Sequence, residues 1–414
     1  MAVMKTRAAK PQRRGNAFDL SEKQLRSRRN SKWSSYGPNV LPAFVAEMDF
    51  LVADPIQKAI LRSVETGDYG YPVRNGTKAE RTVADAFSAR MEGRFGWKAD
   101  PALVQVIGDL VQGTFAAIMA FSEPGDGVIL QVPCYPPFRE TIVTTQRKLI
   151  ALTMRDNGRR HIYDLAELEG QIDDRTRVLI LCNPQNPTGR VFGRDELAAL
   201  AAFAQKHDLV VISDEIHSDL IYDGRKHIPF ASLSREAAAR TVTITSATKS
   251  FNIPGLRCGV MHFGASELRD RFAKRIPTRL LGSGNAMGID ATVAAWTQSD
   301  AWLDKVMAHL TNARDLLVET VHKELPDIRC HAPEGTYLAW LDCGKLRLNT
   351  PAFQFFHDHA RVAFSPGENF EPACPQFVRF NFATSMPLLE QILERVVGAV
   401  KSPERLESLS YAAK

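Results

Sequence analysis

Four polar motifs that could do chemistry directly follow predicted β-strands: residues 108–113, 182–189, 214–217 and 246–259. Lys249 precedes an apolar Phe-Asn-Ile-Pro stretch. A desolvated lysine has a lowered pKa and can form a Schiff base with a carbonyl. Asp214 follows the predicted strand 209–213 and could hold a proton on a heteroaromatic nitrogen. The loop 108–113 opens a predicted helix, 114–121, whose N-terminal N–H groups could bind a phosphate.

Ser246 and Arg257 flank Lys249 and could complete the phosphate site. An aldehyde, a ring nitrogen and a phosphate on one ligand describe pyridoxal 5′-phosphate (PLP). In PLP sites the protein supplies the lysine and the partner of the pyridinium nitrogen, while the cofactor acts as an electron sink. The motifs therefore predict a PLP-dependent enzyme.

The elements that must position these motifs are short β-branched runs that alternate with helical stretches. Continuous apolar strands between helices predict a mostly parallel sheet covered on both faces, an α/β fold. Ligands of such sheets bind beyond the carboxyl ends of the strands, so the motifs should meet at one edge. The predicted strands span residues 103–107, 128–132, 178–181, 209–213, 241–246 and 259–263.

The last part of the chain has a different pattern. Residues 291–325 read as one long helical region, followed by short strand candidates at 337–341 and 377–382 and a closing helix near 388–400. We therefore expect a large PLP-binding domain at 51–290 and a smaller α+β domain at 291–414. Residues 1–50 are predicted to form a basic tail and a segment that packs on the small domain.

Composition narrows the function classes. The net charge is +5, and the excess of Lys and Arg lies in the first 30 residues. No nucleic-acid-binding motif follows this tail, so we expect no nucleic acid partner. No apolar run is long enough to span a membrane. The six cysteines are scattered without a CxxC pair, which favours a reduced cytoplasm. The HDH motif at 357–359 lacks further ligands, so no metal is expected.

Beyond these single motifs, the sequence resembles the fold-type I PLP enzymes, the aminotransferase class I/II superfamily. Within it, the chain is similar to the MalY/PatB-type cystathionine β-lyases, which are cysteine C–S lyases. The resemblance implies an aspartate aminotransferase-like fold. It rests on motifs spread over nearly the whole chain: SKW (31–33), LPAFVAEMDF (41–50), YGYP (69–72), NPQNPTGRVF (183–192), SDEIHSDL (213–220), HIPFASLS (227–234), TKSFNIPGL (248–256), TYLAWLD (336–342) and FVRFN (377–381).

The resemblance assigns the cofactor site residue by residue. Lys249 matches the Schiff-base lysine that also moves the Cα proton, and Asp214 matches the partner of the pyridinium nitrogen. Asn186 matches the residue that bonds the phenolic oxygen of the cofactor. Tyr135 matches the ring stacked on the pyridine, and Ile216 would pack on its other face.

The remaining assignments concern the phosphate, the substrate and a second subunit. Leu110 and Val111 would give backbone N–H groups to the phosphate, beside Ser246 and Arg257. Arg379 matches the arginine that binds the substrate carboxylate. Tyr71 matches a tyrosine that reaches the active site of the neighbouring subunit, which implies a homodimer. His217 is left open between a contact to the cofactor and a satisfied buried histidine.

We therefore predict a PLP-dependent carbon–sulfur β-lyase that cleaves an L-cysteine S-conjugate or cystathionine to a thiol, pyruvate and ammonia. One alternative is an aminotransferase. Another is a tailoring enzyme of specialised metabolism, such as antibiotic (lincosamide) biosynthesis, that acts on S-cysteinyl conjugates by β-elimination or by oxidative decarboxylation–deamination. A regulatory role through a transcription activator is a third. Glu47, which stands where Asp is usual in this branch, and the uncommon phosphate loop leave the substrate open.

Overall fold

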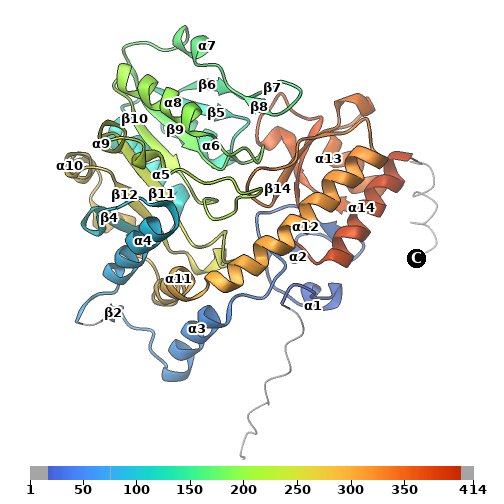
Figure 1. The fold of residues 1–414 in the computed structure, drawn as a ribbon, viewed down its shortest axis with the longest axis horizontal. Coiled ribbons are helices and arrows are strands. Elements are labelled where there is room, and N and C mark those ends of the chain that lie inside the picture. Colours follow the sequence, from blue (N-terminus) through green and yellow to red (C-terminus); the bar gives the residue numbers. More distant parts are fainter. Residues whose placement is uncertain (1–16, 75, 402–414) are drawn as a thin grey trace, which may run out of the picture.

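A seven-stranded sheet forms the centre of the computed structural model, which describes residues 17–74 and 76–401 (Figure 1). Residues 1–16 of the basic N-terminal region therefore lie outside the described residues. The strand order is β4-β12-β11-β10-β9-β5-β6. The strands are β4 (Val104–Ile107), β12 (Gly259–Phe263), β11 (Thr241–Thr245), β10 (Val210–Asp214), β9 (Thr176–Cys182), β5 (Gly127–Val132) and β6 (Lys148–Thr153).

The direction of the strands brings the predicted motifs to one edge of the sheet. Strand β12 runs antiparallel to both of its neighbours, β4 and β11. The other neighbouring pairs are parallel. The carboxyl ends of β4, β9, β10 and β11 therefore share one edge, as expected for an α/β fold. Strand β6 is an addition that the sequence analysis did not contain.

Both faces of the sheet are buried, and the two faces take alternate residues of the strands. Val210 and Ile212 pack in one hydrophobic cluster with α5 (Leu110–Phe121) and α6 (Pro136–Thr144). Leu209 and Val211 pack in another with α8 (Arg194–Lys206) on the opposite face. This period of two explains why the strands are continuously apolar in sequence.

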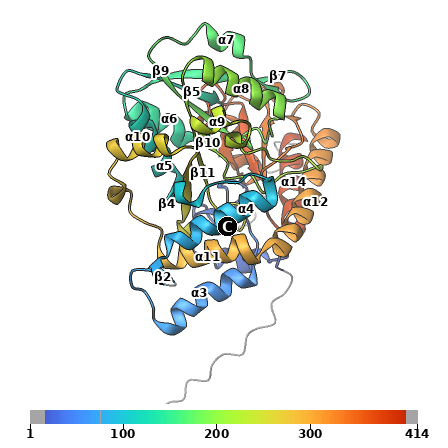
Figure 2. The same ribbon diagram turned by 60° about the vertical axis from the view of Figure 1, so that its left-hand side comes forward.

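A second, antiparallel sheet lies beside the C-terminal helices (Figures 1 and 2). The region predicted as one long helix is divided at Ser299 into α11 and α12. The predicted domain boundary near residue 290 stays a prediction. The elements are β13 (Arg329–Cys330), β14 (Leu338–Asp342), β17 (Phe377–Asn381), β16 (Ser365–Pro366), α11 (Ala286–Gln298), α12 (Asp300–Glu324) and α14 (Met386–Lys401).

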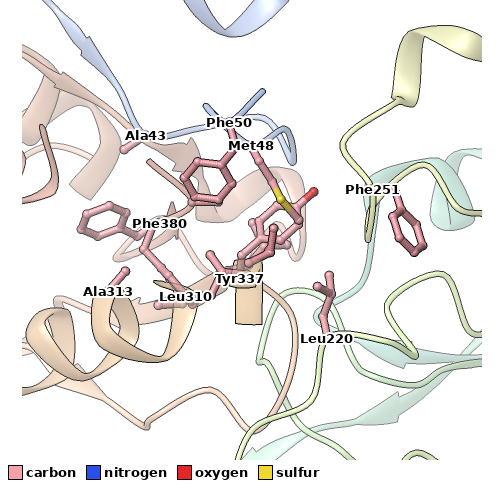
Figure 3. Close-up of a cluster of buried hydrophobic side chains, with 14 of the residues drawn as sticks. Ala43, Met48, Phe50, Leu220, Phe251, Leu310, Ala313, Tyr337 and Phe380 are labelled. Atoms are coloured by element: carbon pink, nitrogen blue, oxygen red, sulfur yellow. The ribbon is translucent and has the colours of Figure 1, made fainter. Parts of the chain in front are cut away.

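The N-terminal segment reaches this second sheet. Strand β1 (Leu41–Pro42) pairs in parallel with β15 (Val362–Ala363). Met48 and Phe50 join a buried cluster that contains Tyr337 and Phe380 (Figure 3). Residues 41–50 are thus tied to the C-terminal part of the chain by main-chain pairing and by burial of apolar side chains.

The remaining elements connect or cover these sheets. Among the described residues, none of the helices is both long and apolar enough to cross a membrane. The other helices and strands are α1 (Glu22–Arg26), α2 (Ser31–Ser34), α3 (Asp54–Thr66), α4 (Glu80–Phe95), α7 (Leu165–Glu169), α9 (Arg235–Ala239), α10 (Ser266–Arg275), α13 (Ala352–Phe355), β2 (Val73–Arg74), β3 (Thr77–Lys78), β7 (Arg155–Asp156) and β8 (His161–Ile162).

Candidate active site

A cavity of about 310 Å³ lies at the edge of the large sheet where β4, β9, β10 and β11 end. Ligand sites of α/β sheets occur at this position because helix N-termini and strand-end loops converge there. The cavity brings together ten of the predicted site residues: Leu110, Val111, Tyr135, Asn186, Asp214, Ile216, His217, Ser246, Lys249 and Arg257.

Asp214 is the last residue of β10, and its side chain is buried. The backbone N–H of Ile216 donates to its Oδ1 at 3.0 Å. Burial nevertheless raises the pKa of Asp214 to about 7. A carboxylate in this position is stabilised by a positive partner, because burial disfavours the charged form.

Lys249 follows β11 and is only partly exposed. Its Nζ donates to the backbone oxygen of Ala46 at 2.9 Å. Burial and then the positive charge of Arg379 lower the pKa of Lys249 to about 8. A larger fraction of this amine is therefore neutral and nucleophilic at neutral pH than for an exposed lysine.

The N-terminus of α5 forms another side of the cavity. The helix begins at Leu110, earlier than the predicted start at 114, so Leu110 and Val111 belong to its first turn. Backbone N–H groups of a first turn lack partners within the helix and attract anions. Here the Oδ1 of Asp109, the N-cap residue, accepts from the N–H of Val111 at 2.8 Å.

Ser246 and Arg257 meet beside this helix. The Ser246 hydroxyl donates to the backbone oxygen of Cys258 at 2.6 Å and accepts from the N–H of Thr248 at 3.1 Å. Arg257 forms an ion pair with Asp109. Its φ of 48° places the residue in the left-handed region, which turns the chain back toward the helix N-terminus.

Three further predicted residues line the middle of the cavity. Tyr135 precedes α6, and burial raises the pKa of its phenol, which keeps the ring neutral. His217 is buried, and its Nδ1 has no hydrogen-bond partner among the described residues. Burial, then Lys249 and Arg379, lower the pKa of His217 to about 3. The histidine that the sequence left open is thus neutral and not fully satisfied. Ile216 is partly buried at the same wall.

Arg379 occupies β17 of the second sheet and is buried. Its guanidinium donates to Oδ1 of Asn186 at 3.0 Å and to Oγ of Ser365 at 3.1 Å, and its Nε is without a partner among the described residues. Burial lowers the pKa of Arg379 to about 10, so it stays charged at neutral pH. A buried cation with no carboxylate partner in the described part of the chain is costly and indicates a binding site for an anion.

Tyr71 does not line this cavity. It is fully exposed, in a stretch that also exposes Tyr69 and Val73. Its predicted role requires a second subunit, and that role stays a prediction.

The structure also shows why the DEIH and HIP motifs occur together. Glu215 is buried and accepts from Ser213 Oγ at 2.8 Å and from the backbone N–H of Phe230 at 2.9 Å. Its other oxygen lies 2.8 Å from Nε2 of His227. Glu215 therefore ties the loop after β10 to the segment 227–230, next to Asp214. Both motifs are visible in the sequence, but the contact between them is not.

A second group missed by sequence reasoning holds residues 44–50, which we call the N-terminal wall. The amide of Asn381 donates to the backbone oxygens of Phe44, Val45 and Glu47 at 3.2, 2.6 and 2.7 Å. Asn252 binds the backbone of Met48 and Phe50. Asparagine suits this role because its amide carries two hydrogens, and in Asn381 one of them is shared between two of the three oxygens. The motifs FVRFN and TKSFNIPGL contain these residues, but their partners could not be read from spacing.

Comparison with known proteins identifies the family of this chain. The model of the family "Aminotransferase class I and II" matches residues 56–396. The chain belongs to this family. Cystathionine beta-lyase PatB of Bacillus subtilis (strain 168) is 32% identical over 390 residues, which cover 92% of this chain and 99% of PatB. The predicted resemblance is therefore confirmed.

Solved structures agree with this family membership. The crystal structure of OvoB aligns with a TM-score of 0.87 and 36% identity over 94% of this chain and 99% of OvoB. Cystalysin from Treponema denticola, whose crystal structure contains PLP, aligns with a TM-score of 0.86 and 28% identity over 94% of this chain and 100% of cystalysin. The predicted fold type I architecture is thereby confirmed.

The cavity of this family member fits PLP group by group. Among the described residues, Asp214 and Lys249 have no ion pair, and the first turn of α5 offers N–H groups besides that of Val111, which already donates to Asp109. A pyridinium nitrogen, an aldehyde and a phosphate answer these three needs. Arg379 and Glu47 then remain as charged groups of the site without an ion pair among the described residues. They are available to a substrate.

Proposed function

We propose that this chain is a PLP-dependent carbon–sulfur β-lyase. It cleaves an L-cysteine S-conjugate or cystathionine to a thiol, pyruvate and ammonia. The observation that carries the proposal is the buried Arg379, unpaired within the described residues, beside the cavity that holds Lys249 and Asp214. PatB and two further bacterial relatives that are at least 31% identical over most of the chain carry the name cystathionine beta-lyase or putative cystathionine beta-lyase.

Arg379 would bind the α-carboxylate of the amino acid substrate. A guanidinium matches a carboxylate with two parallel hydrogen bonds, which fixes direction as well as position. Hydrogen bonds to Ser365 and Asn186 hold this guanidinium, which comes from β17, in place. The carboxylate therefore anchors Cα at a defined place relative to Lys249.

Lys249 would hold the cofactor covalently and, once replaced by the substrate amine, remove the proton from Cα. When bound, PLP supplies an electron sink for the charge left on Cα. Asp214 would hold the ring nitrogen in its protonated form, and Tyr135 would pack against the ring. A Lys249 amine with a pKa near 8 is well matched to accept a proton near neutral pH.

The overall reaction balances without an oxidant. The Cα–H bond breaks first, and then the Cβ–S bond breaks as sulfur leaves with the bonding pair and takes up a proton. Addition of water to the three-carbon fragment gives pyruvate and ammonium. An S-conjugate and water are thus the sole reactants, which separates this reaction from transamination.

The test is pyruvate and thiol release by the PLP-loaded protein from L-cystathionine and from S-propyl-L-cysteine, without any 2-oxo acid. We expect both products in equal amounts, and Lys249→Ala should lower kcat by at least about 10³-fold. The variant should keep the far-ultraviolet circular dichroism of the wild type. Amine transfer that needs a 2-oxo acid, with no thiol released, would show an aminotransferase instead.

We further propose a homodimer in which Tyr71 serves the site of the partner subunit. The full exposure of Tyr71, a few residues along the chain from exposed Leu61 and Val64 of α3, supports a contact surface there. Mixed dimers of Lys249→Ala and Tyr71→Phe protein test it. If Tyr71 acts in the partner's site, each hybrid dimer contains one complete site. Because about half of the dimers in an equimolar mixture are hybrids, the mixture should regain about a quarter of wild-type activity. No regain would place Tyr71 in its own subunit's site or outside the mechanism.

We also place the enzyme in the cytoplasm. All six cysteines are unpaired in the described part of the chain, which suits a reducing compartment. Fractionation of the source cells would test this placement.

A further inference from the structure

The guanidinium of Arg379 lies over an aromatic ring. Its central carbon, Cζ, is 4.7 Å from the centre of the Phe370 ring. Both side chains are buried. A cation is attracted to the negative face of an aromatic ring, and the attraction is larger where water is excluded. Phe370 is therefore a partner of Arg379 in addition to Asn186 and Ser365.

The hydrogen bonds and the ring restrict different motions of the guanidinium. Its hydrogen bonds to Asn186 and Ser365 start from its two terminal nitrogens, Nη1 and Nη2. They fix one edge, but a planar group that is held at an edge can still tilt. The Phe370 ring covers a face of the group and opposes this tilt. The tilt matters because a carboxylate forms its two parallel hydrogen bonds in the plane of the guanidinium.

The ring of Phe370 is itself firmly held. It meets the ring of Trp340 edge to face, with centroids 5.5 Å apart, and Trp340 stacks on Phe377 at 5.0 Å. The tight turn before it is the 3₁₀ element η7 (Gly367–Asn369). A Cβ on Gly367 would collide with the backbone oxygen of Phe377, so glycine is needed for this close packing. Phe370 is thus presented to Arg379 by a closely packed support.

The same segment contacts the loop that carries Tyr135. The backbone N–H of Cys134 donates to the backbone oxygen of Phe370 at 3.1 Å. Glu371 forms an ion pair with Arg139 of α6. Tyr135 lies between these two contacts in the chain, and it lines the candidate cofactor cavity. Phe370 therefore lies where the second sheet meets the cofactor side of the site.

We infer that Phe370 is a positioning residue, which holds the guanidinium of Arg379 in the plane where it receives the α-carboxylate of the substrate. The inference rests on the proposed role of Arg379 in the lyase. Phe370 acts through Arg379 and not on the reacting atoms. Its loss should therefore weaken substrate binding, seen in KM, and leave kcat nearly unchanged.

The experiment compares Phe370→Leu with the wild type, both loaded with PLP. Leucine keeps the place apolar but has no aromatic face. We expect KM for L-cystathionine to rise about fivefold with kcat within about twofold, because a guanidinium that is free to tilt must be ordered when the substrate binds. Phe370→Met, which fills the gap differently and also lacks a ring, is measured beside it.

Sodium propionate is a second probe, because it carries a carboxylate and does not react. Calorimetric titration of the PLP-loaded proteins should show its dissociation constant raised about fivefold in Phe370→Leu. Phe377→Leu is the matched control, since its ring belongs to the same cluster but stacks on Trp340. This control should bind propionate as the wild type does. Unchanged binding in both Phe370 variants, or an equal loss in Phe377→Leu, overturns the inference.

Arg379→Lys shows whether Phe370 acts through the guanidinium. Lysine keeps the positive charge but lacks the planar group. In this background Phe370→Leu should change the dissociation constant of propionate by less than about twofold. An equal weakening in both backgrounds overturns the inference, because it shows a general loosening of the site.

Two failures are kept apart by these measurements. Propionate binding that is the same in Arg379→Lys and the wild type shows that the proposed carboxylate role of Arg379 is wrong, and the inference falls with it. Absence of pyruvate with the wild type removes the lyase function alone, because propionate binding does not depend on which bonds the enzyme breaks. Far-ultraviolet circular dichroism and the visible absorption of bound cofactor verify that each variant is folded and loaded.

Discussion

The two sides of the cavity are positioned by different means. On one side, the cofactor floor (Leu110, Val111, Asp214, Ser246 and Lys249) follows directly from the ends of β4, β10 and β11. On the other side, the N-terminal wall (residues 44–50) is held by hydrogen bonds from the side chains of Asn252 and Asn381 to its backbone. A sheet register fixes the floor, whereas side-chain hydrogen bonds together with the burial of Met48 and Phe50 fix the wall.

Because of this difference, we expect amino-acid substitutions on the two sides to have different effects. The floor inherits its geometry from many cooperative main-chain hydrogen bonds, so single substitutions there change chemistry more than position. The wall depends on a few buried contacts, and each contact that is lost leaves polar groups unsatisfied. We therefore expect substitutions at the wall to alter stability and substrate binding while the cofactor stays bound.

The largest expected effect on the wall comes from Asp49. Its carboxylate is buried, 2.8 Å from Nζ of Lys32 and 2.6 Å from Nε1 of Trp33. Asp49→Ala leaves the buried Lys32 without its ion-pair partner, with only the backbone oxygen of Glu47 at 3.4 Å, and should cost about 3–5 kcal/mol of unfolding free energy. The midpoint of urea unfolding measures this loss of stability. The double variant Lys32→Met, Asp49→Leu should regain much of the loss, and a single variant as stable as the wild type would refute a buried ion pair.

The pH dependence of stability, measured on the protein freed of PLP, tests the burial of Asp214 and Lys249 in the floor. The pKa of Asp214 is about 7 in the folded chain and about 3.9 in the unfolded chain. Between these two pH values the folded state binds more protons than the unfolded state. The free energy of unfolding therefore falls as pH rises from about 4 to 7. The pKa of Lys249 is about 8, against about 10.4 unfolded, so stability rises from about pH 8 to 10.

Thermal unfolding across this range measures both effects, on the order of a few degrees each. Asp214→Asn should remove its contribution to the fall between pH 4 and 7, and Lys249→Met its contribution to the rise above pH 8. Curves of the two variants that run parallel to the wild-type curve would contradict the burial of these groups.

A substitution at Asn381 tests whether the wall can be disturbed while the floor stays intact. Asn381→Ala removes three hydrogen bonds to the backbone of the wall. We expect a loss of about 2 kcal/mol of stability and a KM for L-cystathionine raised about tenfold, with the visible absorption of bound cofactor retained. Loss of the cofactor at unchanged KM would mean that the floor, rather than the wall, depends on Asn381.

The smallest expected effect concerns Ser365, which accepts from the guanidinium of Arg379 at 3.1 Å. Ser365→Ala removes one hydrogen bond and leaves the contact to Asn186. We expect about 1 kcal/mol of weaker substrate binding, seen as a several-fold rise in KM with kcat nearly kept. Ser232→Ala, at a hydroxyl that bonds only its local turn, is the control. A fall in kcat at constant KM would contradict a role in holding the carboxylate site.

Much of the fold and of the floor could be predicted because both follow from local pattern. Asp214 and Lys249 come within a few residues of strands whose continuous apolar character is visible in the sequence, and parallel strands present their ends at one edge. The start of α5 at Leu110 was predicted too late, since Asp109 is an N-cap signal that the glycines of the loop obscured. The break at Ser299 was missed because apolar residues continue on both sides of it.

The wall could not be predicted in the same way. Lys32 and Asp49, or Glu215 and His227, are chemically ordinary residues whose partners lie at separations with no helical or strand period. The place of Glu47 at the cavity depends on how residues 41–50 pack against the second sheet. No local rule relates that packing to the residue types.

The sequence by itself determined the family, the α/β architecture and the identity of the floor residues, because periodicity and strand-end motifs are local properties. The tertiary structure alone decided which charges are left unpaired. Glu47 comes from the N-terminal segment and Arg379 from β17, and both remain available to a substrate because neither has an ion pair within the described residues. Burial and pairing are properties of the assembled fold, and they carry the proposals about substrate.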